Sequence, residues 1–270
     1  MSQTPVTMPI RGPVTMPIDN LSDHFSVRIS HRVGGIVTLN ERTRGLPLLR
    51  ELYRYIFYGK GLLTLGASVA GAYAKTDPQL KYPDFQLSFA PASYRPGTHT
   101  LEREAGMTAM VHQSYPMSRG SVFAQSADTR ELPNVNPNYM SHDEDLRVIV
   151  SAVRHARAIL SQPAMSRYSK AELMPGAHVQ SDEDVLAYAR QVGVSGSHFM
   201  GSCAMGSSPA AVVDHKLRVN GVTSLRVVDA SIFPSVSCGN TQAPTIMAGA
   251  KGAALILNDA NFETAGCCRI

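Results

Sequence analysis

The chain has 270 residues, of which 44% are hydrophobic and 17% are charged, as is typical of a soluble globular protein of one or two domains. Its 21 glycines and 17 prolines predict many turns and argue against an all-helical bundle. The formal net charge is +4, and the basic residues are scattered. A nucleic-acid surface would show a Lys/Arg stripe, so we expect no nucleic-acid partner.

The first residues contain a near-duplication, because TPVTMPI at 4–10 is followed by GPVTMPI at 12–18. Two copies of so short a unit cannot build a repeat architecture. We therefore predict an extended, proline-bounded tail over residues 1–18.

Residues 20–40 predict the first strand, since Phe25, Val27 and Ile29 alternate with polar neighbours as in a half-buried strand. Alternation returns at 82–91, and residues 106–116 and 120–126 predict two further strands. Between the first strand and the alternation at 82–91, residues 45–59 predict a helix. Its one apolar face consists of Leu48, Leu49, Leu52, Tyr55 and Ile56.

The clearest helix follows Ser141, which we predict as its N-cap, with acidic residues at 143–145 and a stop at Pro163. Its apolar stripe consists of Leu146, Ile149, Val150, Val153 and Ile159 or Leu160. A second helix is predicted to begin at Ser181, because Asp184 three residues later completes a variant of the capping box.

The pattern changes after residue 198. An Asn220–Gly221 turn lies between two β-rich runs, and a final helix rich in Ala and Gly begins at Pro244. The order of elements predicts an α+β fold, in which an antiparallel sheet is backed by helices and followed by a C-terminal α/β segment.

The four cysteines form neither a CxxC pair nor a Cys/His set, so we expect free thiols and no metal site. The most apolar segment, from Gly61 to Ala74, is shorter than the roughly 20 residues that a bilayer span needs. The N-terminal residues also lack the pattern of a signal peptide. We therefore expect no transmembrane segment and, by default, a cytoplasmic protein.

Candidate reactive residues are few, and each fits two interpretations on its own. His198 in SHFMGSCAMG is either a structural histidine or a catalytic one. Asp229 ends a buried-looking strand, where an acid either caps a turn or contacts a ligand. Asn240, Thr241 and Gln242 precede a helix, whose free N–H groups can bind electron-rich groups. No GxSxG segment is present, so a hydrolase of that type is excluded.

Taken together and in order, these segments resemble the C-terminal part of the glucose–methanol–choline (GMC) flavin oxidoreductases. The resemblance covers residues 19–257 in collinear order. The matching segments include NLSDH (20–24), SRGSV (118–122), HFMGSCAMG (198–206), VVDHKLRVNGVTSLRVVDAS (212–231) and GNTQAPTIMAGAKGAALI (239–256).

The resemblance implies a substrate-binding domain, an antiparallel sheet with helices, over residues 19–196. It also implies that residues 197–257 return to complete an FAD-binding domain, and residues 258–270 are then a tail. FAD is the implied cofactor, and a small-molecule alcohol, oxidised at its CH–OH group, is the implied substrate.

The resemblance also implies roles for individual residues. His198 would accept the hydroxyl proton while the hydride passes to flavin N5, and Asn240 would hold the hydroxyl oxygen. Asp229 and Ala230 match positions near the FAD pyrophosphate and ribityl chain. Asn240 and Thr241 match positions near the isoalloxazine, and an asparagine at 240 favours a non-sugar alcohol.

The sequence departs from the family in one respect, because it contains no GxGxxG segment in a strand-to-helix context. The nearest spacing begins at Gly59, but Thr64 occupies the third glycine position. Three interpretations follow: an inactive fragment, one half of a split enzyme that pairs with a separate FAD-binding chain, or a substrate-binding module. Without the sheet that it normally covers, the helix from Pro244 would expose apolar surface.

Overall fold

The computed structural model describes residues 18–66 and 68–266, so most of the predicted tail over 1–18 lies outside the described residues. The strands are β1 (Ile18–Leu21), β2 (Phe25–Val33), β3 (Ala70–Ala74), β4 (Phe85–Ala90), β5 (Gly106–Gln113), β6 (Gly120–Phe123), β7 (Asn134–Asn136), β8 (Ser169–Met174) and β9 (Val194–Ser195). The helices are α1 (Leu39–Arg42), α2 (Gly45–Tyr58), α3 (Asp143–Leu160), α4 (Pro163–Ser166), α5 (Asp182–Val192) and α6 (Gln242–Gly266), with short 3₁₀ turns η1 (Leu62–Thr64) and η2 (Ala230–Ile232).

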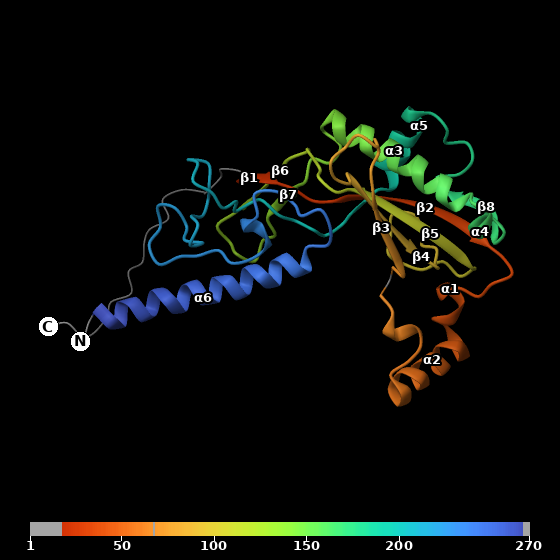
Figure 1. Ribbon diagram of the computed structural model, residues 1–270, viewed down its shortest axis with the longest axis horizontal. Coiled ribbons are helices and arrows are strands. Elements are labelled where there is room, and N and C mark those ends of the chain that lie inside the picture. The colour runs from red at the N-terminus through yellow and green to blue at the C-terminus, as the bar shows by residue number, and fades with distance from the viewer. Residues whose placement is uncertain (1–17, 67, 267–270) are drawn as a thin grey trace.

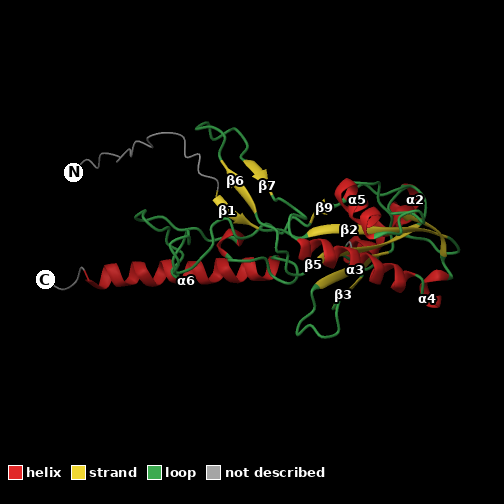
Figure 2. Cartoon of the chain, turned by 90° about the horizontal axis from the view of Figure 1, so that it is seen from above, coloured by secondary structure: helices red, strands yellow, loops and turns green. Residues whose placement is uncertain are grey.

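The main sheet has six antiparallel strands in the order β3-β4-β5-β2-β8, with β9 paired to the start of β2. A second, three-stranded sheet has the order β1-β6-β7. Helices α3 and α5 lie on one face of the main sheet, whereas α2 and α6 extend away from it (Figures 1 and 2). The predicted α+β class with an antiparallel sheet is therefore confirmed.

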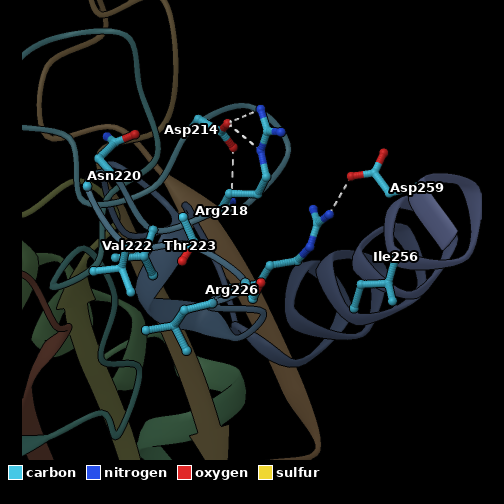
Figure 3. Close-up of a pocket in the computed structure, with 12 residues that line it drawn as sticks. Asp214, Arg218, Asn220, Val222, Thr223, Arg226, Ile256 and Asp259 are labelled. Atoms are coloured by element: carbon cyan, nitrogen blue, oxygen red, sulfur yellow. Dashed lines mark hydrogen bonds and ion pairs between the residues drawn. The ribbon is translucent and has the colours of Figure 1, made fainter. Parts of the chain in front are cut away.

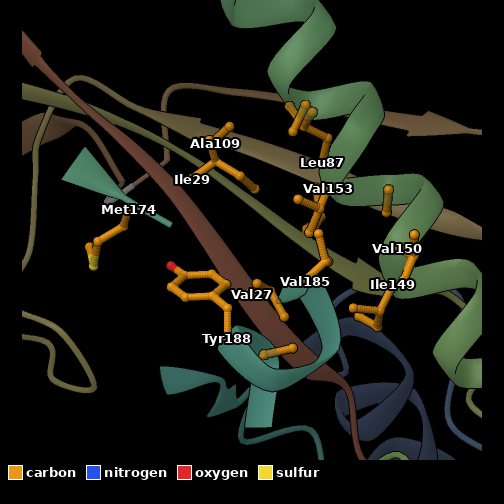
Figure 4. Close-up of a cluster of buried hydrophobic side chains, with 14 of the residues drawn as sticks. Val27, Ile29, Leu87, Ala109, Ile149, Val150, Val153, Met174, Val185 and Tyr188 are labelled. Atoms are coloured by element: carbon orange, nitrogen blue, oxygen red, sulfur yellow. The ribbon is translucent and has the colours of Figure 1, made fainter. Parts of the chain in front are cut away.

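The hydrophobic core fills the space between the main sheet and its two covering helices. Val27 and Ile29 on β2 are fully buried, as are Ile149 and Val153 on α3 and Val185 on α5. Figure 4 shows these side chains pointing toward one another across the interface. The alternation of strand residues and the helical stripe predicted this contact, because each pattern gathers apolar side chains on one face.

The prediction of a half-buried β2 is wrong, because its polar face is buried too. Ser26, Arg28 and Ser30 are all buried on that face. The Arg28 guanidinium lies 4.8 Å from the centre of the Tyr94 ring, and Ser30 Oγ hydrogen-bonds Thr108 Oγ1 at 2.7 Å. The segment after β4 thus covers one end of this face with polar contacts, which replace the solvent that the pattern predicted.

Helix α3 begins one residue later than predicted. Its N-cap is His142, whose Nδ1 accepts the Glu144 N–H at 3.2 Å. Ser141 instead donates its backbone N–H to Ser118 Oγ at 3.0 Å. The turn that precedes β6 therefore uses Ser141, and the next residue caps the helix. The predicted capping box of α5, Ser181 with Asp184, is confirmed.

Helix α2 forms as predicted, but its apolar face is not buried. Leu49 is 60% exposed and Ile56 is 68% exposed. The buried residue of the helix is the acid Glu51, which accepts hydrogen bonds from Arg42 and from the Leu62 backbone N–H. A polar anchor therefore holds α2 in place, and its apolar side chains have no cover in the described part of the chain.

The β-rich runs around the Asn220–Gly221 turn do not form strands, which corrects that prediction. The turn itself is present, with Gly221 at φ +77°, but the flanking residues make only isolated bridges such as Val213 with Val219. The apolar residues pack instead against α6, in a small cluster that includes Val213, Leu217, Ile232 and Ala248. These runs have no neighbouring strand, and α6 covers their side chains.

Helix α6 begins at Gln242, two residues before the predicted start, and continues to Gly266. None of the described helices combines the length and the apolarity that crossing a membrane requires. Cys203 and Cys238 are free thiols, as predicted for them. Ile246, Met247 and Leu257 are 64%, 55% and 64% exposed, so α6 presents an uncovered apolar surface, as the sequence indicated.

Two isoleucines of α3 provide a test of this core. Ile149 is fully buried, whereas Ile159 is 46% exposed. We expect Ile149→Val to lower the free energy of unfolding by about 0.5–1.5 kcal/mol, since it leaves a methyl-sized cavity between helix and sheet. Ile159→Val should change it by less than about 0.5 kcal/mol. Urea denaturation of the three proteins measures both effects, and equal losses would contradict the packing described.

Candidate active site

The loop that carries His198 is held against the segment before β2 at two points. On one side, the Gly196 N–H donates to the His24 carbonyl at 2.7 Å. On the other, Ser22 and Met200 exchange two backbone hydrogen bonds of 2.8 and 2.9 Å. His198 lies between these two points, so local pairing fixes its position over His24.

The carboxylate of Asp23 also stabilises the loop that carries His198. Asp23 is buried, and its Oδ1 accepts the His198 backbone N–H at 2.7 Å. Its Oδ2 accepts the Ser195 hydroxyl at 2.5 Å and also the Tyr139 hydroxyl. Three donors, two from this loop and one from Tyr139, thus converge on one buried carboxylate, which is how a buried acid avoids the cost of desolvation.

Three imidazoles gather at this point. His24 Nδ1 lies 2.9 Å from His198 Nδ1, and the His24 ring stacks on the His112 ring with centroids 4.4 Å apart. Gly196 makes room for the cluster, because a Cβ at that position would lie 3.0 Å from the His24 Cβ and 3.1 Å from His198 Nδ1. A side chain at position 196 would therefore crowd the two rings where they meet.

Burial holds these rings in the neutral form. Burial and, to a lesser extent, the neighbouring His198 together lower the pKa of His24 to about 4. Burial also lowers the pKa of His112 to about 3, with smaller effects from His24 and His198. The pKa of His198 is lowered by burial as well, although the Asp23 carboxylate opposes this shift. All three rings are neutral near pH 7, so His198 can accept a proton.

These shifts predict a pH dependence of stability. Between pH 6.5 and about 4 the unfolded histidines bind protons, while folded His24 and His112 stay neutral. The free energy of unfolding should therefore fall as the pH is lowered, by about 1.4 kcal/mol per pH unit for each histidine. Urea unfolding across this range should show a shallower slope for His112→Leu than for the wild type. Equal slopes in wild type and His112→Leu would contradict the buried neutral state.

A cavity of about 410 Å³ opens beside His198, over the polar face of the main sheet. Ser26, Gln86 and His112 form its floor from three adjacent strands, since Ser26 and Gln86 both pair with His112 in the register. Ser26 Oγ, Gln86 Oε1 and both ring nitrogens of His112 are buried without a hydrogen-bond partner in the described structure. Buried polar atoms are normally paired, so this cluster indicates a ligand site.

Asn240 closes the cavity on the side of α6. Its Nδ2 lies 3.3 Å from His198 Nε2, and both residues line the cavity. The turn before it packs close to β3, because a Cβ on Gly239 would collide with the Tyr73 hydroxyl. The structure therefore brings together the two residues predicted as catalytic, from positions 42 residues apart in sequence.

The other predicted cofactor residues lie outside this cavity. Thr241 adjoins Asn240 at the start of α6, whereas Asp229 and Ala230 lie at η2. Asp229 is exposed and caps η2, with Oδ1 accepting from the Ser231 N–H at 2.8 Å. The Cys203 N–H donates to the Ser231 carbonyl at 3.0 Å, which ties η2 to the His198 loop.

Sequence reasoning missed Asp23, His24 and His112 as members of the site. Asp23 and His24 lie in the NLSDH segment, which was noted for its resemblance and not for its chemistry. His112 stands among apolar residues in MVHQ, and its position on the polar face of β5 was the available signal. The alternation of β5 places His112 opposite Val111, on the side away from the core.

A larger cavity, of about 700 Å³, lies elsewhere, between the 214–226 loop and α6 (Figure 3). Its charged residues pair with one another: Arg218 with Asp214 at 2.8 Å, and Arg226 with Asp259 at 2.5 Å. Their charges are therefore used in holding the loop to the helix. We place the candidate site at the smaller cavity, where buried polar atoms lack partners.

Known proteins resemble this chain over most of its described length. Residues 116–249 match the sequence model of the GMC oxidoreductases. An alcohol dehydrogenase (acceptor) from Pseudomonas putida is 34% identical over 91% of this chain and 45% of its own length. An oxygen-dependent choline dehydrogenase from Brucella anthropi is 36% identical over 88% of this chain and 44% of its own length.

Solved structures show the same fold. A formate oxidase superposes with a TM-score of 0.76 and 22% identity, over 89% of this chain and 47% of the other. Pyridoxine 4-oxidase from Mesorbium loti gives 0.70 and 22%, over 87% and 42%. The fold is thus one found in oxidoreductases. The chain belongs to the GMC oxidoreductase family, and it spans about 45% of the length of the curated relatives.

The residues present fit one part of an FAD molecule. The amide of Asn240, the hydroxyl of Thr241 and the N-terminal turn of α6 offer hydrogen-bonding groups beside the cavity, as the polar edge of an isoalloxazine requires. The sequence holds no GxGxxG segment for the phosphates. This donor set therefore fits the flavin end of the cofactor.

Proposed function

We propose that this chain supplies the substrate-binding and proton-accepting part of an FAD-dependent oxidoreductase that acts on the CH–OH group of an uncharged alcohol. The observation that carries the proposal is the His198–Asn240 pair, 3.3 Å apart at the edge of a cavity with a polar floor. The flavin, when bound, would accept the hydride from the carbinol carbon. His198 and Asn240 would act on the hydroxyl group.

His198 is suited to accept the hydroxyl proton. Its Nε2 faces Asn240 and the cavity, while its Nδ1 contacts His24. Burial lowers the pKa of His198, so the ring is neutral and its lone pair is available at neutral pH. Asn240 cannot act as a base, but its amide can hold the hydroxyl oxygen and orient the carbon–hydrogen bond.

The cavity favours an uncharged substrate. Among the described residues that line it, none is acidic and none is Phe, Tyr or Trp. A quaternary ammonium group is usually recognised by aromatic rings or a carboxylate, and its burial without them is costly. Ser26, Gln86 and Ser88 instead offer hydroxyl and amide groups, while Val69 and Met110 offer apolar contact. These groups suit a small neutral alcohol better than choline.

We further propose that an FAD-binding portion, in the same polypeptide or in a separate chain, covers α6. Ile246 and Met247 are 64% and 55% exposed near the start of this helix, within two turns of Asn240. Contiguous exposed apolar side chains mark an interaction surface. An FAD-binding portion that packs against this part of α6 would place its cofactor next to the cavity.

The visible absorption spectrum tests this proposal. The chain should be colourless when purified alone and should show flavin bands when co-expressed with a GxGxxG-bearing FAD-binding chain. Ile246→Glu, which places a charge on the proposed contact, should abolish the bands, whereas Leu132→Glu on an 83% exposed loop position should not. A colourless product in every preparation would overturn the proposal.

The assembled enzyme then tests the substrate class. We expect kcat/KM for a small neutral alcohol to exceed that for choline by at least about tenfold, because an unmatched buried charge costs more than about 1.4 kcal/mol. A preference for choline would contradict the uncharged cavity while leaving the reaction type intact.

A further inference from the structure

The hydrogen bonds around His198 determine which of its ring nitrogens carries the proton. Asn240 presents its Nδ2 to His198 Nε2 at 3.3 Å. An amide nitrogen only donates, so His198 Nε2 accepts and carries no proton. In the neutral ring, the proton of His198 must then be on Nδ1.

The same reasoning extends to His24. Its Nδ1 lies 2.9 Å from His198 Nδ1, and only one of these two atoms can carry the proton that they share. Since His198 Nδ1 donates, His24 Nδ1 accepts, and the proton of neutral His24 lies on Nε2. His24 is fully buried and stacked on His112, so its ring has little freedom to turn away.

We propose that His24 is a positioning residue that holds His198 in the tautomer whose Nε2 is free to accept a proton. The inference rests on the proposed function only for its consequence, because the tautomer is a property of this chain. In that setting, protonation of Nε2 makes His198 a cation, and its Nδ1–H bond to His24 becomes charge-assisted and stronger. His24 would thus favour the same tautomer before the transfer and stabilise its product.

A structural role alone would require only a ring of the right shape at position 24. The contact with His198, however, joins two nitrogens and not two carbon edges, and it is the sole hydrogen bond that the described structure gives to His198 Nδ1. Asp23 also stabilises this loop, but it accepts the His198 backbone N–H. That contact does not determine which ring nitrogen of His198 carries the proton.

The experiment is ¹⁵N–¹H correlation NMR of the imidazoles, recorded on the 270-residue chain labelled at histidine, with no flavin required. We expect His198 to show a protonated Nδ1 and an unprotonated Nε2. His24→Leu removes the acceptor of the His198 Nδ1 proton and should weaken this preference, because only the Asn240 amide then favours it. His24→Asn, which returns an acceptor oxygen near the position of Nδ1, should restore it.

Three results would overturn the proposal: a wild-type His198 with its proton on Nε2, a tautomer population that is unchanged in His24→Leu, or a failure of His24→Asn to restore the wild-type population. The first corresponds to the reversed Asn240 amide, whose oxygen would accept from Nε2–H. That measurement needs no variant, so a poorly folding His24→Leu leaves the test intact. Loss of turnover in other experiments bears on the proposed reaction and not on this tautomer.

Discussion

His198→Ala should lower turnover of an alcohol by about 10²- to 10⁴-fold in the assembled flavoenzyme, the usual contribution of a general base. The reason is the position of Nε2, which faces both the cavity and the Asn240 amide. The substitution removes the ring but leaves Asn240, Thr241 and α6 in place. Steady-state kinetics measure the loss of turnover, and the flavin spectrum shows whether the cofactor is still bound.

The control for this variant is His215→Ala, which removes an exposed histidine outside the cavity and should leave turnover unchanged. Flavin content should be equal in the two variants, since His198 is proposed to act on the substrate. Wild-type turnover in His198→Ala would remove the residue from its proposed role. A loss of bound flavin would instead show that the residue holds the cofactor.

Much of the fold could be predicted from local patterns. The alternation at Phe25, Val27 and Ile29 and the stripe through Ile149 and Val153 identify surfaces that meet in the core. Such patterns are informative because the spacing of apolar residues determines which side of an element faces away from water. They do not reveal which partner covers the opposite side.

This limit explains the errors. The segment after β4 covers one end of the polar face of β2, while the apolar face of α2 has no cover among the described residues. Nothing within either segment distinguishes these outcomes, because burial depends on distant parts of the chain. The β-rich runs around Asn220 likewise have β propensity but no strand to pair with, so packing against α6 determines their structure.

The site shows the same division. His198 and Asn240 were predicted from a resemblance, and the structure places them together. Asp23, His24 and His112 become visible only once β2, β5 and the His198 loop are assembled, since they come from segments far apart in sequence. A motif identifies residues that contact a substrate more readily than residues that orient them.

Asp23→Ala should lower the free energy of unfolding by about 3 kcal/mol or more, because it leaves three partly buried donors without their charged acceptor, at about 1–3 kcal/mol each. These donors are the His198 backbone N–H, the Ser195 hydroxyl and the Tyr139 hydroxyl. Ser195→Ala, which removes one donor and keeps the carboxylate, should cost only about 1 kcal/mol. Urea denaturation of the wild type and the two variants measures these losses.

Because Asp23 holds the backbone of His198, its loss should also disturb the ring contact with His24. The histidine NMR signals would report this change separately from stability. Equal losses of unfolding free energy in Asp23→Ala and Ser195→Ala would mean that the carboxylate does not organise the site.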